Sequence, residues 1–137
     1  MTNRFRACGF LIFRRSPVPE IILLCSRSRE WGPPKGCQDP GESDLETAYR
    51  ETWEESGLKE HDIHQHSSFE HNISYPHKGS TKRVTFYLGE VGNNVRITLS
   101  NEHGDFKWLS FDKAISQAKY DELKELYVKA KEFISKL

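Results

Sequence analysis

Apolar residues are concentrated in two short runs near the start of the chain. The runs Phe5–Arg15 and Glu20–Ser26 are separated by the Pro17-Val18-Pro19 turn, and this arrangement predicts a pair of neighbouring strands. The segment 29–42 is rich in glycine and proline and predicts a loop. Further predicted strands, separated by turn sequences, cover residues 62–75, 82–91 and 105–111.

The last part of the chain changes to helical spacing. Between Tyr120 and Leu137 apolar residues recur along one helix face, with polar residues on the opposite side, which is typical of a helix that packs on a core. These apolar residues are Leu123, Leu126, Tyr127, Ala130, Phe133, Ile134 and Leu137. We therefore expect an α/β fold of mixed order, with helices packed against one sheet, and a single domain over residues 1–137.

A second helix is predicted directly after the glycine- and proline-rich segment. Ser43 is the expected N-cap, Glu46 completes a capping box three residues later, and Gly57 supplies the left-handed residue that ends the helix. The side of this helix that faces the core is formed by Leu45, Ala48, Tyr49 and Thr52.

Carboxylates crowd onto this helix and the loop before it, which together contain seven acidic side chains within 23 positions. Glu51 and Glu55 are one turn apart at the edge of the core-facing side, and Glu54 completes a cluster of three. Like charges at this spacing cost about 0.2–0.5 kcal/mol per pair, and Arg50, within reach of Glu46 and Glu54, is expected to neutralise only one carboxylate. A solvated acidic face is the alternative, but the position beside the core favours a site for a hard divalent cation such as Mg²⁺.

Composition narrows the classes of function. Twenty basic and twenty acidic residues cancel, so we expect no stable nucleic-acid partner. No apolar stretch approaches the length of a membrane span, and the start of the chain lacks a signal-peptide pattern, so no membrane association is expected. Cys8, Cys25 and Cys37 lack metal-binding spacing and predict free thiols in the cytosol or nucleus. We expect a monomer.

The spacing of the acidic segment resembles the Nudix box, the signature of the Nudix hydrolase family. Five residues separate Gly36 from Glu42, and seven more precede the run Arg50-Glu51-Thr52-x-Glu54-Glu55-x-Gly57-Leu58. The chain departs from the signature at Thr52, where the general box has an aliphatic residue. The resemblance implies a Nudix fold, a mixed β-sheet sandwiched between α-helices, and hydrolysis of a nucleoside diphosphate linked to another group with Mg²⁺ or Mn²⁺.

The resemblance also implies roles for residues of the box. Glu51, Glu54 and Glu55 match the metal ligands of the family, and Lys35 matches the residue whose backbone carbonyl also binds metal. Positions that match structural residues of the motif are Gly36, which allows the loop to approach closely, and Glu42, Arg50 and Gly57.

Segments outside the box resemble one branch of the family, the animal-type hydrolases that cleave diadenosine tetraphosphate asymmetrically into ATP and AMP. The segments WGPPKG, NISYPHKGSTKRVTFYLGEV and LSNEHGDFKWLSFDKA carry this similarity, which extends over nearly the whole chain. The form RETxEE around Thr52 is also usual in this branch. The expected partner is therefore a small dinucleoside polyphosphate.

The same resemblance assigns residues to the substrate. Glu102 matches a glutamate that approaches the metals, and either Glu55 or Glu102 is the expected base that takes a proton from the attacking water. Tyr75 and Tyr120 match aromatic residues that sandwich an adenine ring. Lys82 matches a phosphate contact, which we expect Lys35 and Arg83 to assist.

Three residues of the loop depart from this branch. Glu30 stands where animal members carry a histidine beside the polyphosphate, Gly32 where they carry threonine, and Cys37 where they carry a second histidine. Because the carboxylate of Glu30 would repel phosphate, the departures concern how the distal phosphates are held.

Two alternatives to this substrate remain at the level of sequence. The first is another Nudix substrate, such as a capped RNA end, ADP-ribose, a damaged nucleoside triphosphate or a diphosphoinositol phosphate. The second is a nucleotide-binding sensor that has lost catalysis, although such modules usually have a degraded box and all three glutamates are present here.

Overall fold

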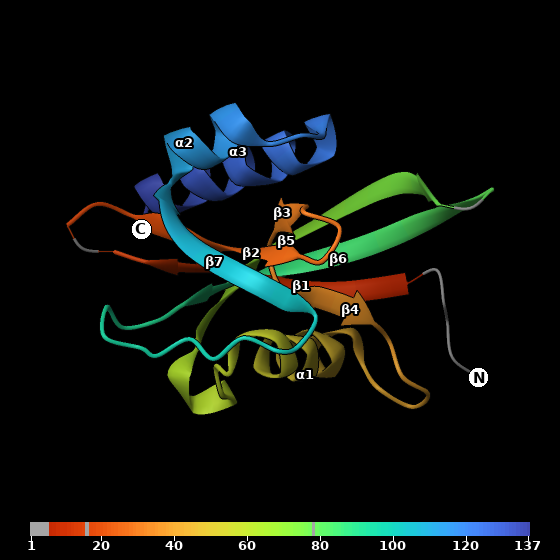
Figure 1. Cartoon of the computed structure of the whole chain (residues 1–137). Helices are drawn as coiled ribbons and strands as arrows, with labels where there is room; N and C mark the ends of the chain where they lie inside the picture. Colours follow the sequence, from red (N-terminus) through yellow and green to blue (C-terminus); the bar gives the residue numbers. More distant parts are fainter. Residues whose placement is uncertain (1–5, 16, 78) are drawn as a thin grey trace.

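A seven-stranded mixed sheet forms the middle layer of the molecule, between helices on both faces (Figure 1). This computed structural model describes residues 6–15, 17–77 and 79–137, and the side chains of residues 75–77 lie outside the description. The strands are β1 (Arg6–Arg14), β2 (Glu20–Ser26), β3 (Trp31–Gly32), β4 (Lys35–Cys37), β5 (His64–His77), β6 (Ser80–Glu90) and β7 (His103–Ser110). The helices are α1 (Asp44–Ser56), α2 (Phe111–Gln117) and α3 (Asp121–Ser135), with a short 3₁₀ turn, η1 (Glu60–Asp62).

Strand β1 is at the centre of the sheet. The continuous order is β3-β2-β1-β6-β5, while β4 pairs with β1 and β7 pairs with β2. The predicted pairing of the first two strands is confirmed as an antiparallel pair. Between β1 and β6 the pairing is parallel, and all other pairs are antiparallel. The expected mixed sheet between helices is therefore confirmed.

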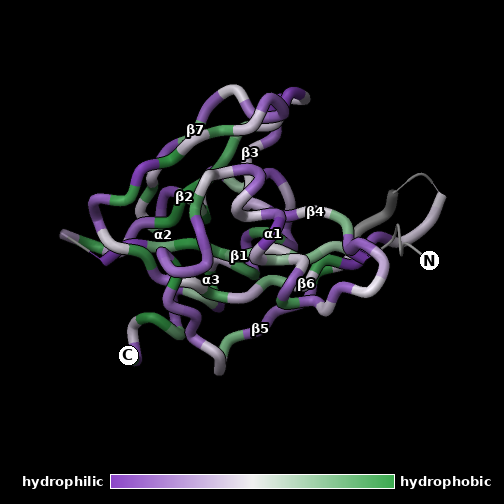
Figure 2. Tube along the Cα trace, turned by 90° about the horizontal axis from the view of Figure 1, so that it is seen from below, coloured by the Kyte–Doolittle hydropathy of each residue, from purple (hydrophilic) through white to green (hydrophobic). Residues whose placement is uncertain are grey.

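Both faces of β1 are buried, because α1 covers one face of the sheet and α2 with α3 covers the other (Figure 1). Alternate residues of the strand point to opposite faces. Leu11 and Phe13 pack on the side of α3, whereas Phe10 and Ile12 pack on the side of α1. In Figure 2 the hydrophobic colour follows β1 and β2 through the interior of the molecule.

The prediction of an unbroken loop over residues 29–42 is wrong, because the short strands β3 and β4 form within it. Gly9 of β1 explains the pairing with β4. A Cβ at Gly9 would lie 2.1 Å from the carbonyl oxygen of Pro34, so only glycine lets the two backbones approach this closely. The amide of Phe10 donates to that carbonyl at 3.3 Å.

Helix α2 is a second departure from the sequence prediction, which extended the last strand through Phe111. The strand ends at Ser110, whose hydroxyl accepts a hydrogen bond from the backbone N–H of Lys113 and so caps α2. Phe111 then begins the helix and is buried against α3 in the core.

The predicted ends of α1 are confirmed. The Ser43 hydroxyl accepts from the Glu46 N–H at 3.1 Å, and the Glu46 carboxylate accepts from the Ser43 N–H at 2.8 Å, which is a complete capping box. Gly57 ends the helix with a φ of 78°. The predicted core-facing side is also confirmed, since Ala48 and Thr52 are fully buried.

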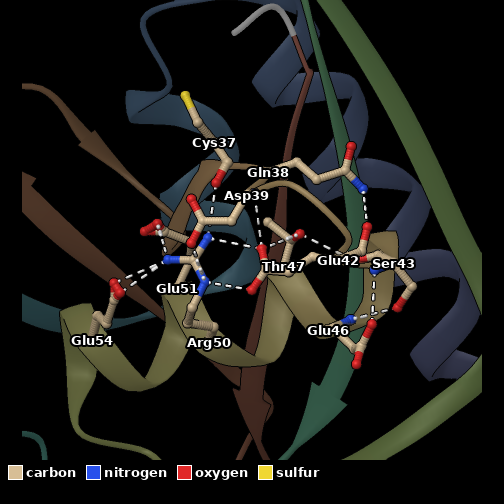
Figure 3. Close-up of polar contacts among 10 residues, drawn as sticks. All are labelled: Cys37, Gln38, Asp39, Glu42, Ser43, Glu46, Thr47, Arg50, Glu51 and Glu54. Atoms are coloured by element: carbon tan, nitrogen blue, oxygen red, sulfur yellow. Dashed lines mark hydrogen bonds and ion pairs between the residues drawn. The ribbon is translucent and has the colours of Figure 1, made fainter. Parts of the chain in front are cut away.

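Arg50 joins α1 to the loop before it (Figure 3). Its guanidinium donates to both carboxylate oxygens of Glu42, at 2.6 and 3.0 Å, and to the carbonyl oxygen of Cys37 at 2.9 Å. It also donates to Glu54 at 3.0 Å and lies 3.5 Å from Glu51. The expectation that Arg50 neutralises only one of Glu51, Glu54 and Glu55 is therefore wrong, because its guanidinium contacts both Glu54 and Glu51. The loop also brings Glu42 to a face of the guanidinium that helix spacing alone does not reach.

Two further features concern the cysteines and the helices. All three cysteines are free thiols, with Cys8 buried and Cys37 exposed. Among the described residues no helix has the length and apolar character needed to cross a membrane.

The bond between Arg50 and Glu42 generates a prediction about stability. The Arg50 guanidinium lowers the pKa of Glu42 to about 2, and the backbone N–H of Asp39 and the hydroxyl of Thr47 add to the shift. A lowered carboxyl pKa stabilises the fold above the unfolded pKa, near 4.3, and this stabilisation is lost as pH falls toward 2. We expect Glu42→Gln to reduce the free energy of unfolding by about 1–3 kcal/mol at pH 7, measured by urea denaturation.

The loss should shrink when the same comparison is made at pH 3, because the Glu42 carboxyl of the unfolded chain, with a pKa near 4.3, is mostly protonated there. Glu125→Gln, on the exposed side of α3, is the matched control and should leave the unfolding free energy within about 0.5 kcal/mol of wild type. An equal loss at both pH values would contradict the assignment of the stabilisation to the Glu42 charge.

Candidate active site

Glu51, Glu54 and Glu55 of α1 lie together but differ in burial. The side chains of Glu51 and Glu55 are 13% and 12% exposed, whereas that of Glu54 is 41% exposed. This difference follows from helix geometry, because Glu51 and Glu55 are one turn apart beside the buried stripe and Glu54 points further toward solvent. The predicted position of the first two at the edge of the core is confirmed.

Gly36 of β4 lies directly against the carboxylate of Glu51. A Cβ built at Gly36 would come within 1.9 Å of the Glu51 Oε2 atom, so any side chain there would displace the carboxylate. The loop thus approaches α1 closely at Gly36, as predicted. The group that it contacts there is the Glu51 carboxylate of the cluster.

Glu55 is held by the same loop. Its Oε1 atom accepts a hydrogen bond from the backbone N–H of Lys35 at 3.1 Å. Lys35 therefore lies at the carboxylate cluster as predicted, through its N–H in this structure, and the predicted metal contact of its carbonyl stays a prediction. Two adjacent loop residues, Lys35 and Gly36, thus contact the two buried glutamates.

Burial and mutual repulsion raise the pKa values of these carboxyl groups. Burial, followed by the negative charge of Glu54, raises the pKa of Glu51 to about 7, although Arg50 acts in the opposite direction. Burial raises the pKa of Glu55 to about 8, with a further contribution from Glu51 and with the Lys35 N–H opposing it. The repulsion among these carboxylates that the sequence predicts is therefore present. Partly buried groups of like charge favour their neutral forms, which raises their pKa values.

His103 is a residue of this site that the sequence reasoning missed. Its Nε2 atom lies 3.8 Å from the Glu55 Oε1 atom, and its Nδ1 atom lies 3.2 Å from the hydroxyl oxygen of Ser100. Burial lowers the pKa of this histidine and so favours its neutral form. Its position next to Glu102 in the sequence was the available signal, but only the pairing of β7 with β2 shows that it reaches α1.

Glu102 is exposed in the turn just before β7. Its charge raises the pKa values of both Glu51 and Glu55, so it is close enough to act on the cluster electrostatically. The predicted proximity of this residue to the three glutamates is consistent with that effect, whereas its role as metal ligand or base stays a prediction.

The residues predicted to hold substrate lie in two other places. Lys82 is partly exposed on β6, opposite Tyr75 of β5, and the side chain of Tyr75 lies outside the described residues. Tyr120 precedes α3 and is 43% exposed, with its hydroxyl donating to Glu30 at 2.8 Å. The adenine sandwich predicted for the two tyrosines therefore stays a prediction.

The donor set of the cluster fits a hard divalent cation. Among the described residues no three His, Cys, Asp or Glu side chains already converge on one point as a metal cage. Nevertheless, Glu51 and Glu55 present carboxylate oxygens beside the Gly36 backbone, and their raised pKa values mark a place where a cation would relieve repulsion. Glu51, Glu54 and Glu55 are the side chains that would hold such an ion.

Thr52 stands at the position where the general Nudix box has an aliphatic residue. The residue is fully buried, and its hydroxyl is the one buried side-chain polar atom without a hydrogen-bond partner among the residues that the structure describes. The position therefore behaves as an apolar one, although the residue carries a hydroxyl group.

Comparison with known proteins identifies the family to which this site belongs. The chain matches the family model described as NUDIX domain over residues 3–135. It is 38% identical to the bis(5'-nucleosyl)-tetraphosphatase [asymmetrical] of Rattus norvegicus, covering 94% of this chain and 95% of the relative. It is 33% identical to the protein of the same name from Caenorhabditis elegans, covering 95% and 96%.

Solved structures of Nudix hydrolases have the same fold as this chain. The structure of a C. elegans Ap4A hydrolase binary complex matches with a TM-score of 0.93 at 32% identity, covering 97% of this chain and 99% of that one. A more distant Nudix hydrolase from M. smegmatis shares the fold alone, with a TM-score of 0.79 at 15% identity. The sheet topology, the carboxylate cluster on α1 and the loop that contacts it, together with these matches, show that the chain belongs to the Nudix family.

Proposed function

We propose that this protein hydrolyses diadenosine tetraphosphate asymmetrically, releasing ATP and AMP, with Mg²⁺ as the cofactor or Mn²⁺ in its place. The observation that carries the proposal is the contact of Glu51 and Glu55 with the backbone of Lys35 and Gly36. The similarity of the chain to asymmetrical tetraphosphatases along nearly its whole length supports it. The free cysteines fit action in a reducing compartment, the cytosol or nucleus.

Each residue of the site has a task in this proposal. Glu51, Glu54 and Glu55 hold the cation, which when bound would lower the pKa of a water molecule and neutralise charge that develops on phosphate oxygens. Arg50 keeps the loop against the helix. Lys35 and Lys82 bind phosphate groups, and Tyr75 and Tyr120 stack on the adenine ring.

The attacking water reaches the fourth phosphorus, counted from the adenosine whose ring stacks on Tyr75 and Tyr120. The water oxygen therefore ends in AMP, and the other product is ATP. The base that accepts the water proton is Glu55 or Glu102. Glu55 is buried and already oriented by the Lys35 N–H, with His103 beside it, whereas Glu102 is exposed at the edge of the cluster. Separate glutamine variants at the two positions distinguish them.

Incubation of the purified protein with diadenosine tetraphosphate and Mg²⁺ in ¹⁸O-labelled water tests the reaction, with products identified by mass. ATP and AMP with the label in AMP are the expected result. ADP alone would mean symmetrical cleavage. Absence of products with tight nucleotide binding would favour the sensor, and faster turnover of ADP-ribose or capped RNA would favour another Nudix substrate.

Removal of the Glu55 charge should abolish most of the activity. We expect Glu55→Gln to lower kcat by about 10²–10⁴-fold, while the glutamine carbonyl still accepts the Lys35 N–H, so the thermal unfolding midpoint should change little. The matched control, Glu125→Gln, should retain wild-type kcat. Turnover at the wild-type rate by Glu55→Gln in saturating Mg²⁺ would contradict the assignment.

A methyl group at Gly36 should act on metal binding through Glu51. In Gly36→Ala the new Cβ occupies the place of the Glu51 carboxylate, so the Mg²⁺ concentration for half-maximal activity should rise at least about tenfold. Gly92→Ala is the matched control, because a Cβ at Gly92 meets nothing within 4 Å. An unchanged Mg²⁺ requirement in Gly36→Ala would separate Glu51 from the metal.

A further inference from the structure

A cavity of about 310 Å³ lies on the face of the sheet that α2 and α3 cover, the face opposite α1. Its inner wall includes the buried residues Leu23, Ala114 and Tyr127. Its outer wall includes two exposed residues, Glu30 from the turn before β3 and Tyr120 from the junction of α2 and α3. The cavity is therefore open to solvent on the side where these two residues meet.

Glu30 and Tyr120 are joined across this open side. The Tyr120 hydroxyl donates to the Glu30 Oε1 atom at 2.8 Å, although the two residues are 90 positions apart in the chain. The ammonium group of Lys119 lies 3.6 Å from the same oxygen and 5.5 Å from the centre of the Tyr120 ring. An exposed tyrosine ordinarily samples several ring positions, and these contacts stabilise the orientation that Tyr120 has in this structure.

The backbone of Glu30 is itself fixed. Its N–H donates to the Ser26 hydroxyl at 3.2 Å, and its carbonyl accepts from the Ser26 N–H at 2.9 Å. The next residue, Trp31, forms another wall of the cavity, and the Lys107 ammonium lies 4.1 Å from the centre of its ring. The backbone of Glu30 is thus held by two hydrogen bonds to Ser26, next to the Trp31 ring that lines the cavity.

The same loop connects the cavity to the carboxylate cluster. Glu30 is five residues before Lys35, whose N–H holds Glu55. In the proposed function the phosphates bind at the α1 cluster and an adenine stacks on Tyr120, so the loop from Glu30 to Lys35 would lie along a single nucleotide. The Glu30 carboxylate is already engaged by a hydroxyl and an ammonium group, which reduces its repulsion of phosphate.

We propose that Glu30 is a positioning residue that holds the Tyr120 ring at the open side of this cavity, ready to stack on a base of the dinucleotide. The inference rests on the proposed function. It gives the acidic residue at position 30, where animal relatives carry histidine, a task in binding the base in place of binding phosphate. The hydrogen bond, and not the negative charge of the residue, carries the effect.

A double-mutant cycle tests the inference. Glu30→Ala and Tyr120→Phe each remove one end of the hydrogen bond, so each should raise KM for diadenosine tetraphosphate about five- to tenfold, with kcat within about twofold of wild type. The double variant should have a KM no higher than either single variant, because the shared bond is lost once. Glu30→Gln keeps an acceptor for the hydroxyl and should have a KM near that of wild type.

Two matched controls accompany the cycle. Tyr87→Phe removes a hydroxyl on the opposite face of the sheet, and Glu125→Gln removes an exposed carboxylate on α3; both should retain the wild-type KM. Unchanged KM in Glu30→Ala, multiplicative effects in the double variant, or equal losses in Glu30→Gln and Glu30→Ala would each overturn the inference.

Failure of the proposed function would give a different result, namely no turnover by the wild-type protein. The cycle then uses the Kd of Mg²⁺-ATP measured by calorimetry. A five- to tenfold weaker Kd in both single variants would still support the role of Glu30. Equal Kd values for wild type and Glu30→Ala, or no binding by the wild type, would overturn it.

Discussion

The guanidinium group of Arg50 is the interaction on which the site depends, because it joins the loop of β4 to the helix that carries the glutamates. Through Glu42 and the Cys37 carbonyl it fixes both ends of the turn between β4 and α1. With that turn fixed, the backbone of Gly36 lies against the Glu51 carboxylate. Arg50 thus converts a flexible glycine-rich segment into one wall of the candidate metal site.

The site combines this rigidity with an unresolved electrostatic conflict. Glu51 and Glu55 are buried enough for their pKa values to rise to about 7 and about 8, whereas Glu42, paired with Arg50, has its pKa lowered to about 2. Carboxylates of one helix and its preceding loop therefore divide into Glu42, which is paired with Arg50, and a cluster whose repulsion Arg50 only partly compensates. This cluster is the part that a divalent cation and a polyphosphate would complete.

Predictions from sequence succeeded where a residue pattern acts locally. The capping box of Ser43 and Glu46, the glycine end of α1 and its buried stripe all depend on residues three or four positions apart. They failed where distant segments compete. The β4 strand forms because Gly9 admits the Pro34 backbone, and α2 begins at Phe111 because Ser110 caps it and α3 offers a core.

By itself the sequence predicted a carboxylate cluster suited to a metal ion, since the spacing of Glu51, Glu54 and Glu55 is set by the helix that the same residues form, and the resemblance to the Nudix box added the expectation of hydrolysis. Only the tertiary structure decided which groups surround that cluster. His103 reaches Glu55 because β7 pairs with β2, and Glu30 bonds to Tyr120 because α2 and α3 fold over the sheet. Such contacts join residues many positions apart, and their distances depend on the packing of the whole sheet, which no local pattern encodes.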